Sequence, residues 1–129
     1  MRELIEKAWE DRELINSKPH VQAIKQVLAD LDQGKLRVAE PTTKGWQVNE
    51  WVKKAVVLYF PVRKMTTVTM GPFEFHDKMK LKTNYAEKGV RVVPHAIARY
   101  GAYVASGVIM MPSYVNIGAY VDSGTMVDT

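Results

Sequence analysis

The chain has 129 residues, of which 47% are hydrophobic and 25% are charged, so it can form one medium-sized globular domain or two small ones. It contains no cysteine, which excludes disulfides, a thiolate nucleophile and a cysteine-bound metal. The net charge of +4 comes from lysines and arginines that are spread along the chain among acidic residues, a pattern typical of a solvated surface and not of a nucleic-acid site.

The first third of the chain has the apolar spacing of two amphipathic helices. In residues 3–15 the apolar stripe consists of Leu4, Ile5, Ala8 and Trp9. A second stripe runs from Val21 to Leu31, with Pro19 near its first turn and Gly34 as its expected C-terminal cap. We predict a helical hairpin. Because no segment resembles a signal peptide or a membrane span, we expect a soluble, cytoplasmic protein.

The middle of the chain mixes strand and helix patterns. Alternation around Leu36–Val38 and Trp46–Val48, on either side of a turn at residues 41–45, predicts two short strands. Asn49 is the expected cap of a third helix, and Pro61 is expected to end it. Residues 62–90 show strand fragments around a Gly-Pro turn and one helical turn before Gly89. We therefore predict an α+β domain over residues 1–90.

The last third of the chain repeats every six residues, whereas a helix or a simple strand has a period of 3.6 or 2. Bulky apolar residues, which we expect to point inward, lie at Ile97, Tyr103, Ile109, Val115, Val121 and Val127. Small residues follow four positions later, at Gly101, Gly107, Ser113, Ala119 and Thr125. This period, with turn residues between the two series, is typical of a parallel β-helix that has three short strands in each triangular coil. An antiparallel meander of short strands is the alternative.

The repeat continues to the last residue without the polar cap that covers the terminal coil of a solenoid. The hexapeptides also make fewer than two coils, which bury too little surface to be stable alone. We therefore expect the chain to be an N-terminal part of a longer protein, with residues 91–129 forming the beginning of a β-helix that is truncated at the C-terminus.

Several segments resemble tetrahydrodipicolinate N-succinyltransferases. They are RVVP at 91–94, MPSYVNIGAYVD at 111–122, GTMVDT at 124–129, KLRVAE at 35–40, Trp46 and WVKKAV at 51–56. Residues 18–20 and 64–71 depart from the family pattern. The resemblance implies an α+β N-terminal domain followed by the start of a left-handed parallel β-helix of the hexapeptide-repeat acyltransferase type, and a homotrimer. It also implies succinyl transfer from succinyl-CoA, a co-substrate and not a bound cofactor, to the amino group of ring-opened tetrahydrodipicolinate in lysine and diaminopimelate biosynthesis.

The resemblance also assigns two site residues. Arg91 corresponds to a substrate-binding arginine of the family, and Asp128 to a substrate-binding aspartate that we expect to be catalytic. A guanidinium group can bind a carboxylate through two hydrogen bonds, and an amine nucleophile must lose a proton. The alternatives are a salt bridge of Arg91 to Glu87 or Asp77, and a solvent-facing loop role for Asp128. Most residues that hold CoA in the family lie beyond residue 129.

Two other functions remain open from the sequence. One is a non-catalytic, trimer-forming hexapeptide-repeat module, and the other is a hexapeptide acyltransferase with another acceptor. His20, His76 and His95 match no compact metal-ligand motif, so we expect no metal site.

Overall fold

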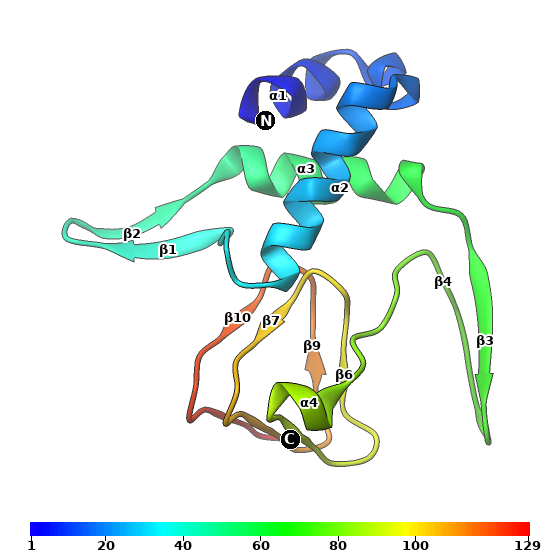
Figure 1. The fold of residues 1–129 in the computed structure, drawn as a ribbon, viewed down its shortest axis with the longest axis vertical. Helices are drawn as coiled ribbons and strands as arrows, with labels where there is room; N and C mark the ends of the chain where they lie inside the picture. The colour runs from blue at the N-terminus through cyan, green and yellow to red at the C-terminus, as the bar shows by residue number, and fades with distance from the viewer.

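The computed structural model describes residues 1–129 and places helices at one end of the molecule and short parallel strands at the other (Figure 1). The helical end contains α1 (Arg2–Glu10), the 3₁₀ helix η1 (Arg12–Asn16), α2 (Lys18–Asp32) and α3 (Glu50–Val62). The three α-helices pack around a core whose fully buried side chains include Ile5, Ile24, Val27, Leu28, Val52 and Leu58. The apolar stripes of the sequence are therefore buried as predicted.

The predicted helix over residues 3–15 is wrong in its length. The chain leaves α1 at Asp11, which has extended backbone angles, and continues as η1. The Asp11 carboxylate accepts a hydrogen bond from the backbone N–H of Glu13, so the aspartate caps the new helix and does not continue the old one. The second helix begins and ends where its signals predicted, with Pro19 in its first turn and Gly34 in the left-handed region just beyond its end.

The third helix corrects two details of the prediction. Asn49 is at the N-cap of α3, but its side-chain oxygen accepts no hydrogen bond from the helix N–H groups, and its Nδ2 donates to the carbonyl of Arg37 (2.8 Å). Pro61 lies inside the last turn, and α3 continues to Val62. Asn49 therefore fastens the loop that precedes the helix.

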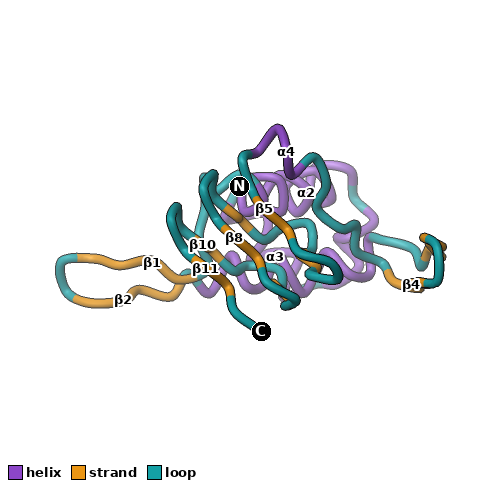
Figure 2. The backbone as a smooth tube through the Cα atoms, turned by 90° about the horizontal axis from the view of Figure 1, so that it is seen from below, coloured by secondary structure: helices purple, strands orange, loops and turns teal.

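Two hairpins project from opposite sides of the body (Figure 2). The first pairs β1 (Ala39–Thr42) with β2 (Gly45–Val48). β1 begins three residues later than the predicted strand, because Leu36 and Val38 pack against the helical core. The second pairs β3 (Thr66–Met70) with β4 (Phe73–Asp77). Each hairpin has a glycine with positive φ at or directly after its turn, and most of the strand residues are exposed.

The parallel end follows α4 (Tyr85–Lys88) and consists of seven two-residue strands: β5 (Arg91–Val92), β6 (Ile97–Ala98), β7 (Tyr103–Val104), β8 (Ile109–Met110), β9 (Tyr114–Val115), β10 (Tyr120–Val121) and β11 (Met126–Val127). Each strand pairs in parallel with the third strand after it, which gives the ladders β5-β8-β11, β6-β9 and β7-β10. The chain therefore winds in three-sided coils, and the antiparallel meander is excluded.

The predicted set of inward residues is partly wrong. Val115 is buried and Val121 packs against the core of the coil, as predicted. Ile97 and Ile109 are half-buried and lie outside that core, and Tyr103, although it contacts the core, pairs with Tyr120 on the other side of its strand from Val104. The residue after each of the three, Ala98, Val104 or Met110, is the buried one that fills the interior. The reason is a change of spacing: strands begin six residues apart up to β8, but β9 begins five residues after β8. A six-residue series that is read across this step therefore mixes outward with inward positions.

The two ends of the molecule meet where α2 stops. Asp32, the last residue of α2, accepts hydrogen bonds from Lys82 Nζ (2.6 Å) and from the backbone N–H of Gly101 (3.0 Å), which lies at a corner of the coil. The coil approaches so closely that a Cβ on Gly34 would lie 2.8 Å from the ring of Tyr103. The helical core thus holds the first coil in a fixed position.

Candidate functional site

The strands β5, β8 and β11 run side by side as one ladder of the coil (Figure 2). The outer side of this ladder carries both residues that the family resemblance predicted for the site. Side chains alternate between the two sides of a strand, and here Val92, Met110 and Val127 point into the core of the coil. One outward row is therefore Arg91, Ile109 and Met126, which are paired in register. Backbone hydrogen bonds from Val93 to Met110 and from Met111 to Val127 extend the ladder to a second outward row, Val93, Met111 and Asp128. We call these six residues the β8 face.

Arg91 is exposed at one edge of the β8 face. Its guanidinium group forms no ion pair or side-chain hydrogen bond in the chain. The salt bridges considered as alternatives are absent, since Asp77 binds Arg99 Nη2 (2.6 Å) and Glu87 forms no ion pair. Arg91 therefore keeps all its side-chain donors available for a ligand.

Asp128 is exposed at the opposite edge of the β8 face. Its Oδ1 accepts a hydrogen bond from the backbone N–H of Thr129 (2.8 Å), and Thr129 Oγ1 donates to the carbonyl of Pro112 (2.9 Å). Asp122 makes the same contact with the N–H of Ser123 (2.8 Å). The local geometry therefore fits a loop role at both aspartates, and in both it leaves one carboxylate oxygen without a partner.

Arg91 and Asp128 share one surface but do not touch. They lie two strands apart and two residues out of register, which corresponds to about 12 Å between their Cα atoms at ordinary strand spacing. A small ligand with an anionic group at one end and an amine at the other can bridge them. The arrangement suits binding of a carboxylate at Arg91 and interaction of an amine with Asp128.

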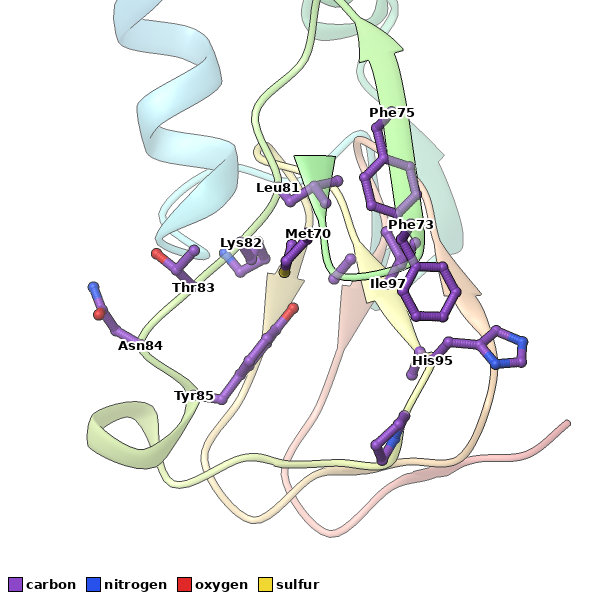
Figure 3. Close-up of a pocket in the computed structure, with 13 residues that line it drawn as sticks. Met70, Phe73, Phe75, Leu81, Lys82, Thr83, Asn84, Tyr85, His95 and Ile97 are labelled. Atoms are coloured by element: carbon purple, nitrogen blue, oxygen red, sulfur yellow. The ribbon is translucent and has the colours of Figure 1, made fainter. Parts of the chain in front are cut away.

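The sequence did not indicate a cleft of about 540 Å³ between the β3–β4 hairpin and the coil (Figure 3). Its walls come from three segments, and its lining residues are mostly apolar: Met70, Phe73, Phe75, Leu81, Pro94, Ala96, Ile97 and Ala98, with Lys82, Thr83, Asn84, Tyr85 and His95. The alternating Phe73 and Phe75 were the one sequence signal for this wall. Burial raises the pKa of the Tyr85 hydroxyl, and the Lys82 ammonium is hydrogen-bonded to Asp32, so neither group is available for acid–base chemistry and the walls offer mainly apolar surface.

The Lys82–Asp32 pair was also missed, because its partners are fifty positions apart in the sequence. Burial lowers the pKa of Lys82, and the hydrogen bond and charge of Asp32 oppose that shift. The side chain of Lys82 is only 3% exposed, so the carboxylate provides the charge partner that a buried ammonium group requires. The pair supports the corner of the first coil and does not reach the β8 face.

No group of three or more histidine, aspartate or glutamate side chains is arranged so that it could hold a metal ion. No helix combines the length and the apolar character that crossing a membrane requires.

Comparison with known proteins gives a consistent result. Residues 1–62 match the family described as tetrahydrodipicolinate N-succinyltransferase N-terminal. The chain is 47% identical to the 2,3,4,5-tetrahydropyridine-2,6-dicarboxylate N-succinyltransferase of Dechloromonas aromatica over 97% of this chain and 49% of the relative. It is 42% identical to the protein of the same name from Parvibaculum lavamentivorans over 100% of this chain and 50% of the relative. The protein of that name from Acinetobacter baylyi is 49% identical over 84% and 42%, respectively. The chain thus spans about half the length of the curated relatives it matches.

Proposed function

Since the chain belongs to the tetrahydrodipicolinate N-succinyltransferase family, we propose that it forms part of an enzyme that transfers a succinyl group from succinyl-CoA to the amino group of ring-opened tetrahydrodipicolinate, in lysine and diaminopimelate biosynthesis. The observation that carries this proposal is the placement of Arg91 and Asp128 on one face of the coil. This face lies in the part of the chain where the motifs resemble the family.

The proposed reaction uses these two residues in different ways. Arg91 binds a carboxylate of the acceptor through charge-assisted hydrogen bonds. The acceptor nitrogen attacks the thioester carbonyl of succinyl-CoA, the new N–C bond forms, and the C–S bond breaks. Asp128 takes the proton that the nitrogen loses, and the departing CoA thiolate takes up a proton from solvent.

The fold proposal extends what the ladders show. We propose that residues 1–90 form the α+β N-terminal domain and that residues 91–129 begin a left-handed parallel β-helix. The parallel pairing of every third strand supports this proposal. In a cytoplasmic homotrimer, adjacent coils would pack side by side and enclose the β8 face. Sedimentation that finds a fully active monomer would contradict the trimer.

The role of Asp128 is tested in a full-length enzyme that contains this sequence, by measuring thiol release from succinyl-CoA at saturating acceptor. Asp128→Asn keeps the size and the hydrogen bond to Thr129 but removes the base, so turnover should fall on the order of a hundredfold or more. Asp122→Asn is the matched control, because Asp122 makes the same backbone contact at an equivalent corner. Near-normal turnover of Asp128→Asn would leave this residue a loop aspartate.

The role of Arg91 is tested by the Michaelis constants for the two substrates. Arg91→Ala should raise the KM for the dicarboxylate, by a loss of roughly 1.5–3 kcal/mol of charge-assisted hydrogen bonding, and should leave the KM for succinyl-CoA nearly unchanged. Lys88→Ala, at an exposed basic residue nearby, is the control. An equal change in the two Michaelis constants would contradict acceptor binding by Arg91. If the wild-type enzyme releases no thiol from succinyl-CoA, the proposed activity is wrong.

A further inference from the structure

The middle of the β8 face is apolar although it points away from the core of the coil. Ile109 lies beside Arg91 in one outward row, and Met111 lies beside Asp128 in the other. Both are half-buried, and neither is among the residues that pack against the buried core of the coil. Their apolar character is therefore not explained by the packing of this chain.

The positions of these two residues place them between the site residues. Arg91 is on β5 and Asp128 follows β11, and β8 is the strand between them. The straight line that joins Arg91 to Asp128 runs diagonally over the ladder and crosses β8 between Ile109 and Met111. A ligand that touches both site residues must therefore lie across these two side chains.

We propose that Ile109 and Met111 determine the specificity of the acceptor site by contacting the methylene segment of the dicarboxylate. This inference rests on the proposed function, because it concerns the acceptor of that reaction. The ring of 2,3,4,5-tetrahydropyridine-2,6-dicarboxylate carries methylene groups between its two carboxyl-bearing carbons, and opening the ring leaves them as a flexible apolar chain. Covering this chain with Ile109 and Met111 removes apolar surface from water, while Arg91 and Asp128 hold the polar ends.

Contact with Ile109 and Met111 also makes the site sensitive to the chain length of the acceptor. Strand spacing fixes the separation of Arg91 and Asp128, so an acceptor that lacks one methylene cannot engage both residues and cover both apolar side chains. A missing methylene in an apolar site costs tenfold or more in discrimination. The wild-type enzyme should therefore prefer the natural chain length over 2-amino dicarboxylates that are one methylene shorter.

The test is steady-state kinetics of the full-length enzyme with Met111→Ala, Met111→Gln and Ile109→Ala. Each change should raise the KM for the dicarboxylate about tenfold, leave the KM for succinyl-CoA near its wild-type value, and reduce the preference over the shorter analogue. Met111→Gln keeps the length of the side chain and so separates loss of apolar contact from loss of volume. Met126→Ala is the matched control, since Met126 lies on the same ladder, is 57% exposed and is off the diagonal.

The outcomes distinguish the two proposals. If the wild-type enzyme transfers no succinyl group to the dicarboxylate, the proposed function fails. If the wild-type enzyme is active but the Met111 and Ile109 variants keep its dicarboxylate KM and length preference, or if Met126→Ala changes them equally, the specificity role is wrong. Circular dichroism of each variant shows whether it is folded, and Met111→Leu, which conserves apolar contact, should restore near-normal kinetics.

Discussion

Replacing Lys82 by methionine should destabilise the junction between the helical core and the coil more than any other single change of a charged residue. The substitution keeps an apolar stem of similar length but removes the ammonium group that lies 2.6 Å from Asp32 Oδ1. The Asp32 side chain is 18% exposed, so its carboxylate then lacks a charge partner in a largely dry site. The one remaining hydrogen-bond partner of the Asp32 carboxylate is the N–H of Gly101. Asp32 also lies at the C-terminal end of α2, where the helix dipole disfavours an anion.

The size of the effect follows from comparison with a second ion pair. Breaking a buried pair by removing one partner costs about 3–5 kcal/mol, and the partial exposure of Asp32 points to the lower end, about 3 kcal/mol. Lys54 Nζ and Glu6 Oε2 lie at a similar distance, 2.7 Å, but the two side chains are 29% and 35% exposed. Lys54→Met should therefore cost about 1 kcal/mol or less. The double change Asp32→Asn with Lys82→Met removes both charges and keeps an acceptor for Gly101, so it should recover about 2 kcal/mol.

Hydrogen exchange at the backbone N–H of Gly101 measures the junction directly, and urea unfolding measures the whole protein. Lys82→Met should speed exchange at Gly101 strongly, and Lys54→Met should not. Asp32→Asn alone should lower the pKa of Lys82 further, because the carboxylate is the group that opposes the effect of burial. In the wild-type protein the pKa of folded Lys82 lies below its ordinary value of 10.5. Between these two pKa values the unfolded chain binds more protons than the folded one, so the stability of the fold should rise as pH increases through this window. Equal losses for Lys82→Met and Lys54→Met would refute the reasoning.

Three further changes test other parts of the structure. The hydrogen bond from Arg99 holds the pKa of Asp77 below its ordinary value of 3.8, so the pair stabilises the fold above that pH and the stabilisation is lost as pH falls through the folded pKa. Because the Asp77 side chain is 41% exposed, Asp77→Asn should cost about 0.5–1 kcal/mol at neutral pH in urea unfolding, and the difference from wild type should vanish in acid. Gly34→Ala should lower stability by about 2 kcal/mol in a denaturant melt, because φ is +75 and the new Cβ would meet the Tyr103 ring. Met110→Ala should cost about 2–5 kcal/mol in the same melt, since Met110 is fully buried in the coil, and a loss below about 1 kcal/mol would mean that this core is loosely packed.

The parts of the fold that could be predicted are those with a local signal. The apolar stripe from Val21 to Leu31 gave α2 with its ends, and the six-residue period gave short strands at the right places up to Ile109. The predicted inward series is only partly right because β9 begins five residues after β8, so the members of the series before this step lie on the outer side and those after it point inward. Asp11 ended α1 early because its side chain capped the next helix, a competition that helical spacing does not show.

The candidate site also has features that the sequence indicated and features that it did not. Arg91 and Asp128 were singled out through resemblance, and their position on one face follows from ladder register, which no local pattern contains. The Lys82–Asp32 pair and the apolar cleft were not predicted, since each brings together segments that are remote in the sequence. Ile109 was expected to point inward, and its outward position is what places it between the two candidate site residues, Arg91 and Asp128.

The β1–β2 hairpin has a practical use for experiments in solution. Its turn at Thr43 and Lys44 is exposed and stands away from the coil (Figure 1). These 129 residues contain no cysteine, so Lys44→Cys would introduce one attachment point for a fluorophore or a spin label in this part of the protein. A second cysteine in place of Thr69 on the opposite hairpin would allow the separation of the two arms to be followed while substrates are added. Such labels would report motion of the arms without touching the β8 face.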